Sequence, residues 1–158
     1  MSMIKTKQQN ADSVRREFRR LSRLGHGRAF LVFRDNPHID FTKDIISLCV
    51  HDYTYDAQCE GNRSEYAMQF VRALSPHARA KVIAAVKKRL QGEAVSNSWH
   101  YEHLCITAAK IAREFDGTLG DILRTLYATC DDDTVYRVFP ESALLELDGF
   151  EGLIAVAR

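Results

Sequence analysis

The chain has 158 residues, of which 46% are hydrophobic and 27% charged, and its formal net charge is +1 at pH 7. These proportions exclude a disordered chain, and the length is that of one ordinary domain. No apolar run approaches the roughly 18 residues of a membrane span, and the first ten residues lack the apolar core of a signal peptide. We therefore expect a cytoplasmic protein without a membrane partner, in which residues 1–9 are flexible and residues 10–158 fold as a single helical domain.

The first element in chain order is a helix rich in arginine. Val14, Phe18 and Leu21 form its narrow apolar stripe, and its arginines lie three and four residues apart, where side chains share a helix face. Such a face is typical of phosphate binding and also of a solvated surface. If nucleic acid is a partner, we expect weak, salt-sensitive binding through Arg15, Arg16, Arg19, Arg20 and Arg23.

Two stretches do not show a helical pattern. Residues 29–33 are continuously apolar, and residues 134–139 alternate between apolar and polar with a period of two. Because two strands alone would make a marginal sheet, we expect a short buried helix at 29–33 and an extended linker at 134–139. The alternative is an α+β domain with a small two-stranded hairpin.

The remaining segments place apolar residues at the 3.6-residue period of amphipathic helices. Ser75 and Pro76 are typical of an N-cap and a first helical position, and Gly92 is expected to end that helix. A longer helix should follow Ser98 and stop at a left-handed Gly117. The expected inward side chains are those of Ile45, Ile46, Cys49, Tyr53, Tyr66, Ala67, Phe70, Val71, Leu74, Val82, Ile83, Val86, Leu90, Leu104, Cys105, Ala108, Ile111, Ala112, Phe115, Leu119, Ile122, Leu123, Leu126, Cys130, Ala143, Leu144 and Leu147.

Short connections between these helices predict antiparallel neighbours that bury their apolar stripes against each other. The sequence thus predicts an all-α fold of antiparallel helix pairs stacked as a HEAT-like α-solenoid. A helix-pair spacing of roughly 35 to 45 residues fits such arrays, although no residue pattern repeats clearly between pairs.

Two stretches resemble a known family. Residues 55–66, YDAQCEGNRSEY, resemble a segment near the start of uncharacterised bacterial HEAT-repeat-containing proteins, and residues 147–153, LDGFEGL, resemble a second segment of those proteins. The resemblance implies a helical-repeat fold of which this chain is the N-terminal part. It implies no catalytic or binding residues.

The connection before Tyr66 is the most polar corner of the chain. Asn62 and Glu65 have the spacing of a capping box with asparagine in place of serine or threonine. Nearby charges could form a network that ties two helices together, or a ligand or partner site. The residues of this corner are Asp56, Glu60, Arg63 and Glu65.

No pattern of reactive or metal-binding residues stands out. Cysteines are scattered without CxxC spacing, so we expect reduced thiols, mostly in the core. His100 and His103 lie three residues apart, but no third ligand follows at a recognisable spacing. The other histidines are isolated in the sequence: His26, His38, His51 and His77. We therefore expect no catalytic residue, no metal and no cofactor.

Charge is distributed unevenly along the chain. Residues 1–28 carry eight cations against two carboxylates, a balance of +6, whereas residues 131–158 carry two cations against seven carboxylates, a balance of −5. The last residues also form an apolar run with no cap after it. This predicts either further repeats or a homo-oligomer formed through the C-terminal helix.

These observations favour a non-enzymatic helical scaffold or interaction module that binds another macromolecule, with protein the expected partner. The alternative is a nucleic-acid-binding helical array, or an enzyme of the HEAT-like alkylpurine DNA glycosylase type. A continuous positive concave face would favour the alternative.

Overall fold

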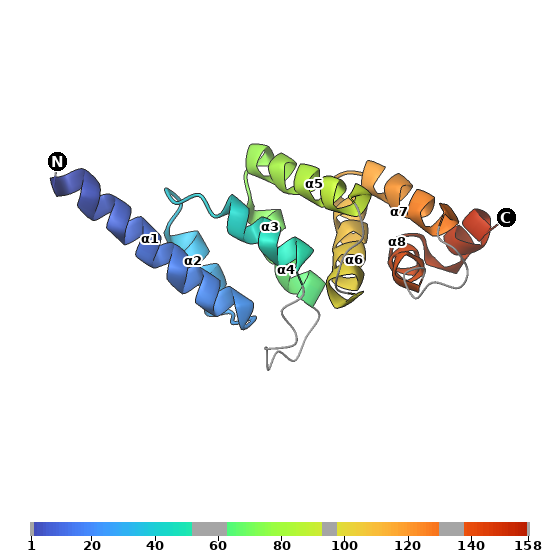
Figure 1. The fold of residues 1–158 in the computed structure, drawn as a ribbon, viewed down its shortest axis with the longest axis horizontal. Helices are drawn as coiled ribbons and strands as arrows, with labels where there is room; N and C mark the ends of the chain where they lie inside the picture. Colours follow the sequence, from blue (N-terminus) through green and yellow to red (C-terminus); the bar gives the residue numbers. More distant parts are fainter. Residues whose placement is uncertain (1, 52–62, 93–97, 130–137, 158) are drawn as a thin grey trace.

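The computed structural model describes the backbone of residues 2–51, 63–92, 98–129 and 138–157, and the side chains of residues 10–51, 63–92, 101–129 and 140–149. Eight helices occupy these ranges and no strand occurs within them (Figure 1). The helices are α1 (Ser2–Arg23), α2 (Arg28–Asp35), α3 (Thr42–Val50), α4 (Arg63–Ala73), α5 (Pro76–Gln91), α6 (Ser98–Glu114), α7 (Thr118–Thr129) and α8 (Val138–Ala157). The all-α prediction is confirmed, and residues 29–33 belong to a short helix as expected. The expected burial of this helix was wrong, because Ala29 is its one buried residue and Leu31 is 45% exposed.

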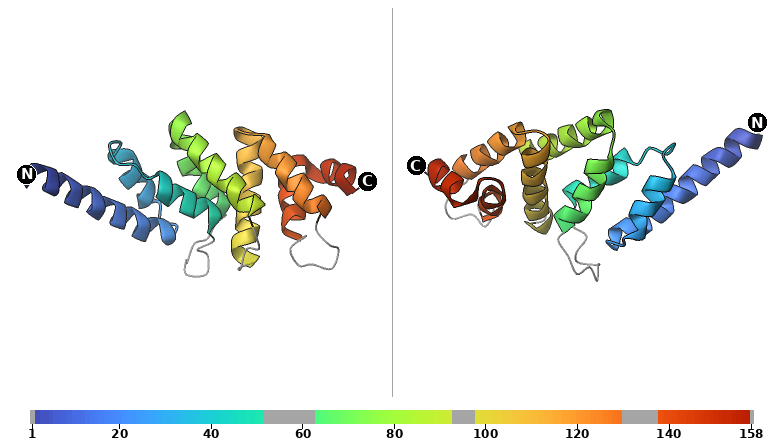
Figure 2. Two further views of the ribbon diagram at one scale, coloured as in Figure 1. Left: turned by 45° about the horizontal axis from the view of Figure 1, so that its top comes forward. Right: turned by 180° about the vertical axis from the view of Figure 1, so that it is seen from behind.

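The helices follow one another along an elongated body, with α1 at one end and α8 at the other (Figures 1 and 2). Contacts join helices two apart in the chain, α3 with α5, α4 with α6, α5 with α7 and α6 with α8. Helix α6 lies at the centre and packs against α3, α4, α5, α7 and α8. No helix within the described ranges is long and apolar enough to cross a membrane.

An aromatic cluster holds the N-terminal helices together. The Phe70 ring on α4 lies 5.3 Å from the Phe18 ring on α1 and 5.7 and 5.8 Å from the Phe30 and Phe33 rings on α2. Phe18 and Phe70 are fully buried. Rings at these separations attract each other beyond the apolar area that they bury, so α4 fixes the positions of α1 and α2.

The core around α6 is built from small and medium-sized side chains. Leu104, Cys105, Ala108 and Ile111 are fully buried, and the alanines allow the neighbouring helices to approach closely. The burial predicted for Cys49 and Cys105 is confirmed. Phe115 was expected in this core but is 37% exposed, because it follows the last residue of α6. The Arg79 guanidinium lies over its ring, 4.2 Å from the centroid, in a cation–π contact.

Two helices begin with the same capping arrangement. The Asp40 carboxylate accepts from the backbone N–H and hydroxyl of Thr42 at 2.9 and 2.6 Å, and the Asp116 carboxylate accepts from the same groups of Thr118 at 3.0 and 2.6 Å. Gly117 thus lies within a helix start and has no positive φ. The prediction of a left-handed stop at Gly117 was wrong, because the aspartate before it already turns the chain.

Arginines from later helices close the C-terminal ends of earlier ones. Arg63 of α4 donates to the carbonyls of Ser22 and Arg23 at 3.5 and 3.0 Å, where α1 turns through a left-handed Gly25 (φ 65°). Arg79 of α5 donates to three carbonyls at the end of α4, those of Val71, Arg72 and Leu74, at 2.9 to 3.0 Å. Each arginine satisfies helix-end acceptors and lies at the negative end of the helix dipole.

Ion pairs join α4, α6 and α8 along one row. The Arg72 guanidinium binds both oxygens of Glu114 at 2.7 and 2.8 Å and also Glu65 at 2.6 Å. Lys110 links Glu65 at 3.1 Å to Glu146 at 3.3 Å. Because these charges form a network in partly exposed positions, they fix the relative register of three helices and contribute modestly to stability.

The Asp116 cap should make stability pH-dependent. Hydrogen bonds from Lys87 and Thr118 lower the pKa of Asp116 from 3.8 to about 2, so its contribution is present above pH 3.8 and is lost as the pH falls towards 2. We expect Asp116→Ala to lower the free energy of unfolding by about 1 kcal/mol at pH 7. Urea titrations should show this difference shrinking between pH 4 and 2, whereas Asp35→Ala should show little difference at either pH.

The hydrogen bonds that Arg79 donates to the end of α4 should contribute more to stability than its positive charge does. We expect Arg79→Ala to lower the free energy of unfolding by about 1 to 3 kcal/mol, because three helix-end carbonyls lose their donor, two of them in partly buried positions. Arg79→Lys should recover only part of this, since lysine lacks the planar fork. Arg89→Ala, an exposed arginine on the same helix, serves as the control and should change stability by less than about 0.5 kcal/mol in thermal melts.

Candidate functional site

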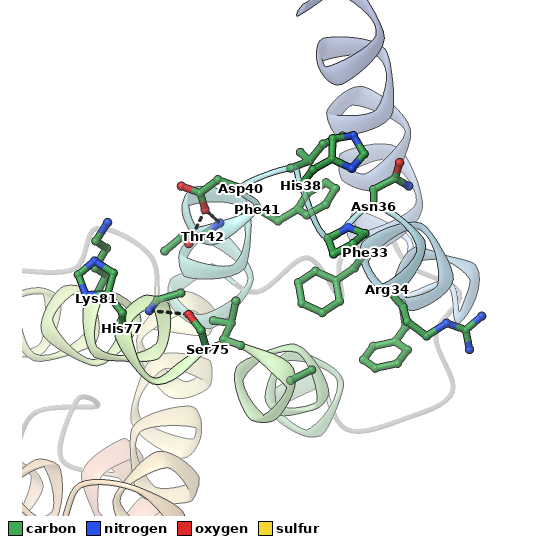
Figure 3. Close-up of a pocket in the computed structure, with 16 residues that line it drawn as sticks. Phe33, Arg34, Asn36, His38, Asp40, Phe41, Thr42, Ser75, His77 and Lys81 are labelled. Carbon is green, nitrogen blue, oxygen red and sulfur yellow. Dashed lines mark hydrogen bonds between the residues drawn. The ribbon is translucent and has the colours of Figure 1, made fainter. Parts of the chain in front are cut away.

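A hollow lies between α2, the loop that leads into α3, and the beginning of α5 (Figure 3). We name it the α2–α5 groove. Its volume of about 600 Å³ falls in the range of binding clefts. It is lined by Phe30, Phe33, Arg34, Asn36, Pro37, His38, Ile39, Asp40, Phe41, Thr42, Ala73, Leu74, Ser75, His77, Ala78 and Lys81.

The floor of the groove is the outer side of the aromatic cluster. Phe33 lies 5.9 Å from Phe30 and 5.8 Å from Phe41, measured between ring centroids, and all three rings border the hollow. Phe30 and Phe33 are half-buried, whereas Phe41 and Leu74 are almost fully buried. The groove therefore exposes part of an aromatic surface whose other side is fixed in the core.

The rim of the groove carries cations on opposite sides. Arg34 stands on the α2 side, and His77 and Lys81 stand on the α5 side, with His38 on the loop between α2 and α3 (Figure 3). All four side chains are exposed. Arg34 pairs only through Nε with its neighbour Asp35 at 3.0 Å, and both side chains are 61% exposed, so this pair is weak. In Figure 3 the Arg34 side chain extends away from α5, and Lys81 lies at the opposite edge, so the positive charge stands at the outer edges of the groove.

Asp40 is the one carboxylate among the residues that line the groove, and it forms hydrogen bonds within the fold. Its Oδ1 caps α3 through Thr42, and its backbone carbonyl accepts from Arg15 Nε at 3.4 Å. The Thr42 hydrogen bonds, with lesser effects from Lys81 and Arg15, hold the pKa of Asp40 below its usual range. Asp40 is thus an ionised structural cap, and it offsets only part of the positive charge around it.

The corner between α4 and α5 positions the α5 wall. Ser75 is the N-cap of α5 and accepts from the Ala78 N–H at 3.2 Å, while Pro76 occupies the first helical position. Arg79 then ties the start of α5 to the end of α4. These contacts confirm the predicted start of this helix and hold His77 in place at the groove.

The arginines predicted to bind a partner are mostly paired within the chain. Arg15 pairs with Asp12 at 3.4 Å, Arg19 pairs with Asp44, and Arg20 binds both oxygens of Glu17 at 2.8 and 2.9 Å. Arg16 is exposed, and the carbonyl of Arg23 accepts from Arg63. Three of the five arginines thus have a carboxylate partner within the chain, and α1 keeps an excess of positive charge, with seven cations against two carboxylates in residues 2–23. Nucleic-acid binding through this helix stays a prediction.

The predicted polar corner is only partly visible. Asp56 and Glu60 lie outside the described residues, as does Asn62 of the expected capping box. Arg63 is buried and reaches α1, and Glu65 pairs with α6. Both charges thus connect helices, which is the structural alternative weighed for this corner.

The described residues offer little to covalent or metal chemistry. Within residues 10–51, 63–92, 101–129 and 140–149 no group of three potential metal ligands occurs. His103 is buried with its Nε2 at 2.7 Å from the Leu48 carbonyl, which ties α6 to α3. Complete burial raises the pKa of the Cys49 thiol to about 12, so this sulfur is no nucleophile at neutral pH.

The groove was not predicted, because His38 and His77 are isolated in the sequence. The two histidines are 39 positions apart in the numbering, yet both follow a proline and both line the same hollow. The paired Pro-His dipeptides, Pro37-His38 and Pro76-His77, were the available signal. Each marks the approach to a helix start, and the fold brings the two starts together.

Comparisons with protein-family models, with curated proteins and with solved structures gave no match to this chain.

The rim cations should be dispensable for folding. Arg34 and Lys81 are exposed, and apart from the weak pair with Asp35 no hydrogen bond or ion pair joins either side chain to the described residues. We expect the double variant Arg34→Glu, Lys81→Glu to change the free energy of unfolding by less than about 1 kcal/mol in urea titrations. A larger loss of stability would mean that Arg34 and Lys81 support the fold, and it would count against the groove as a binding site.

Proposed function

We propose that this chain is a non-enzymatic helical interaction module that binds a protein partner in the α2–α5 groove. The observation that carries the proposal is an open aromatic floor, formed by Phe30 and Phe33 and supported by the buried Phe41, between exposed cationic side chains. Aromatic residues and arginine are enriched where proteins bind one another, and a rigid hollow lowers the entropy cost of association.

The arrangement of the helices supports the same proposal. Contacts between helices two apart in the chain are the pattern of stacked helix pairs, and such stacks present extended surfaces to partners. A HEAT-like repeat architecture, the resemblance to HEAT-repeat-containing proteins and a cytoplasmic location are parts of this proposal.

Filling the groove tests the proposal directly. Ala73 is exposed at the end of α4 and lines the groove, so Ala73→Trp should occupy the hollow without disturbing the core. Ala84, exposed on α5 and outside the groove lining, gives the matched control Ala84→Trp. Affinity capture from the native lysate with mass spectrometry would supply a partner, which is then purified and titrated against each variant. We expect at least about tenfold weaker binding for Ala73→Trp and unchanged binding for the control.

Equal binding by both tryptophan variants would contradict the proposal. Capture of nucleic acid instead of protein would do so as well, if the binding is lost when Arg15, Arg16, Arg19 and Arg20 are reversed in charge. That result would favour the nucleic-acid alternative.

A further inference from the structure

The charge around the α2–α5 groove restricts the chemistry of its occupant. We propose that the groove binds an acidic protein segment that inserts an aliphatic or aromatic side chain between α2 and α5, with Asp or Glu residues on either side of this anchor. The inference rests on the proposed function, because it specifies the partner of the same groove.

The floor selects for an apolar anchor. The Phe30 and Phe33 rings are half-buried, so each keeps exposed apolar surface that faces the hollow. Covering this surface with an apolar side chain removes it from water on both sides of the contact, which is favourable at about 25 cal/mol per Å². A volume of about 600 Å³ accommodates one or two large side chains and the backbone that carries them.

The rim selects for negative charge on both sides of that anchor. Arg34 and Lys81 are exposed at opposite outer edges of the groove, so carboxylates that lie beyond the anchor on either side of it can each approach one cation (Figure 3). His38 and His77 add donors at the same rim. The Asp40 carboxylate, which would repel such a segment, accepts two hydrogen bonds from Thr42, and its single charge is smaller than the combined charge of Arg34 and Lys81.

A basic segment is disfavoured by the same arrangement. Lysine or arginine next to the anchor would carry the same charge as Arg34 and Lys81, and like charges across an interface are costly. Asp40 would be its one acidic partner among the groove-lining residues, and its Oδ1 already accepts two hydrogen bonds. Charge complementarity therefore distinguishes between the two kinds of segment.

Three synthetic peptides of equal length test this inference with the full chain. The first places leucine and phenylalanine anchors among Asp and Glu residues, the second replaces every acidic residue with lysine, and the third keeps the acidic residues but replaces both anchors with serine. Fluorescence anisotropy at about 0.15 M salt should show binding of the first peptide at least about tenfold tighter than of the other two.

Two pairs of variants separate the contributions of the floor and the rim. Ala73→Trp should weaken the first peptide by at least about tenfold, and Ala84→Trp should not. The double variant Arg34→Glu, Lys81→Glu should weaken it by about tenfold, whereas Lys88→Glu, Arg89→Glu, two exposed cations of α5 outside the groove lining, should change it less than about twofold.

The outcomes distinguish this inference from the proposed function. If a captured partner is sensitive to Ala73→Trp but indifferent to reversal of Arg34 and Lys81, the groove is a protein site and the acidic chemistry is wrong. Equal binding of the acidic and basic peptides, or of the peptides with and without anchors, overturns the inference. Sedimentation that shows a dimer of the chain broken by Ala73→Trp overturns it too, because a second copy is then the occupant.

Discussion

The structure depends on arginines that satisfy the open ends of short helices. A helix leaves its last four carbonyls without intrahelical donors, and in helices of 8 to 22 residues these groups are a large share of the backbone. Arg63 closes α1 from α4, and Arg79 closes α4 from α5. Each bond couples the end of one helix to the start of a later one, so the same contacts that satisfy the backbone also set the angles between helices.

The groove is a consequence of this frame. Arg63 and the Tyr66 hydroxyl, which donates to the His26 carbonyl at 2.8 Å, fix the end of α1 and the loop before α2 to α4. Phe70 then packs beneath α2. Arg79 turns α5 away from the end of α4, and the space left between α2 and α5 exposes the outer side of the aromatic cluster. A surface that shares its rings with the core is held rigid without contacts of its own, which favours binding.

Charge has two separate uses in this molecule. Along α1 and between α4, α6 and α8 cations face carboxylates of the same chain, as in the Arg20–Glu17 and Arg72–Glu114 pairs. At the groove rim Arg34 and Lys81 are placed where the only lining carboxylate is already committed to a helix cap. A count of charges along the sequence gives α1 the strongest positive signal, and it does not reveal that Arg34 and Lys81 lie on opposite sides of one groove. The arrangement of charge in space, and not only its total, determines which partner a surface attracts.

The sequence alone determined the helices, because the period of apolar residues and the local capping residues act over a few positions. The stripe through Phe70 and the Ser75-Pro76 start of α5 were readable for this reason. Three features were decided only by the tertiary structure. The Asp116 cap replaces a left-handed stop at Gly117, and Phe115 lies outside the core. Arg34 and Lys81, far apart in the sequence, line one groove. These features depend on how helices meet, which is set by contacts between residues far apart in the chain.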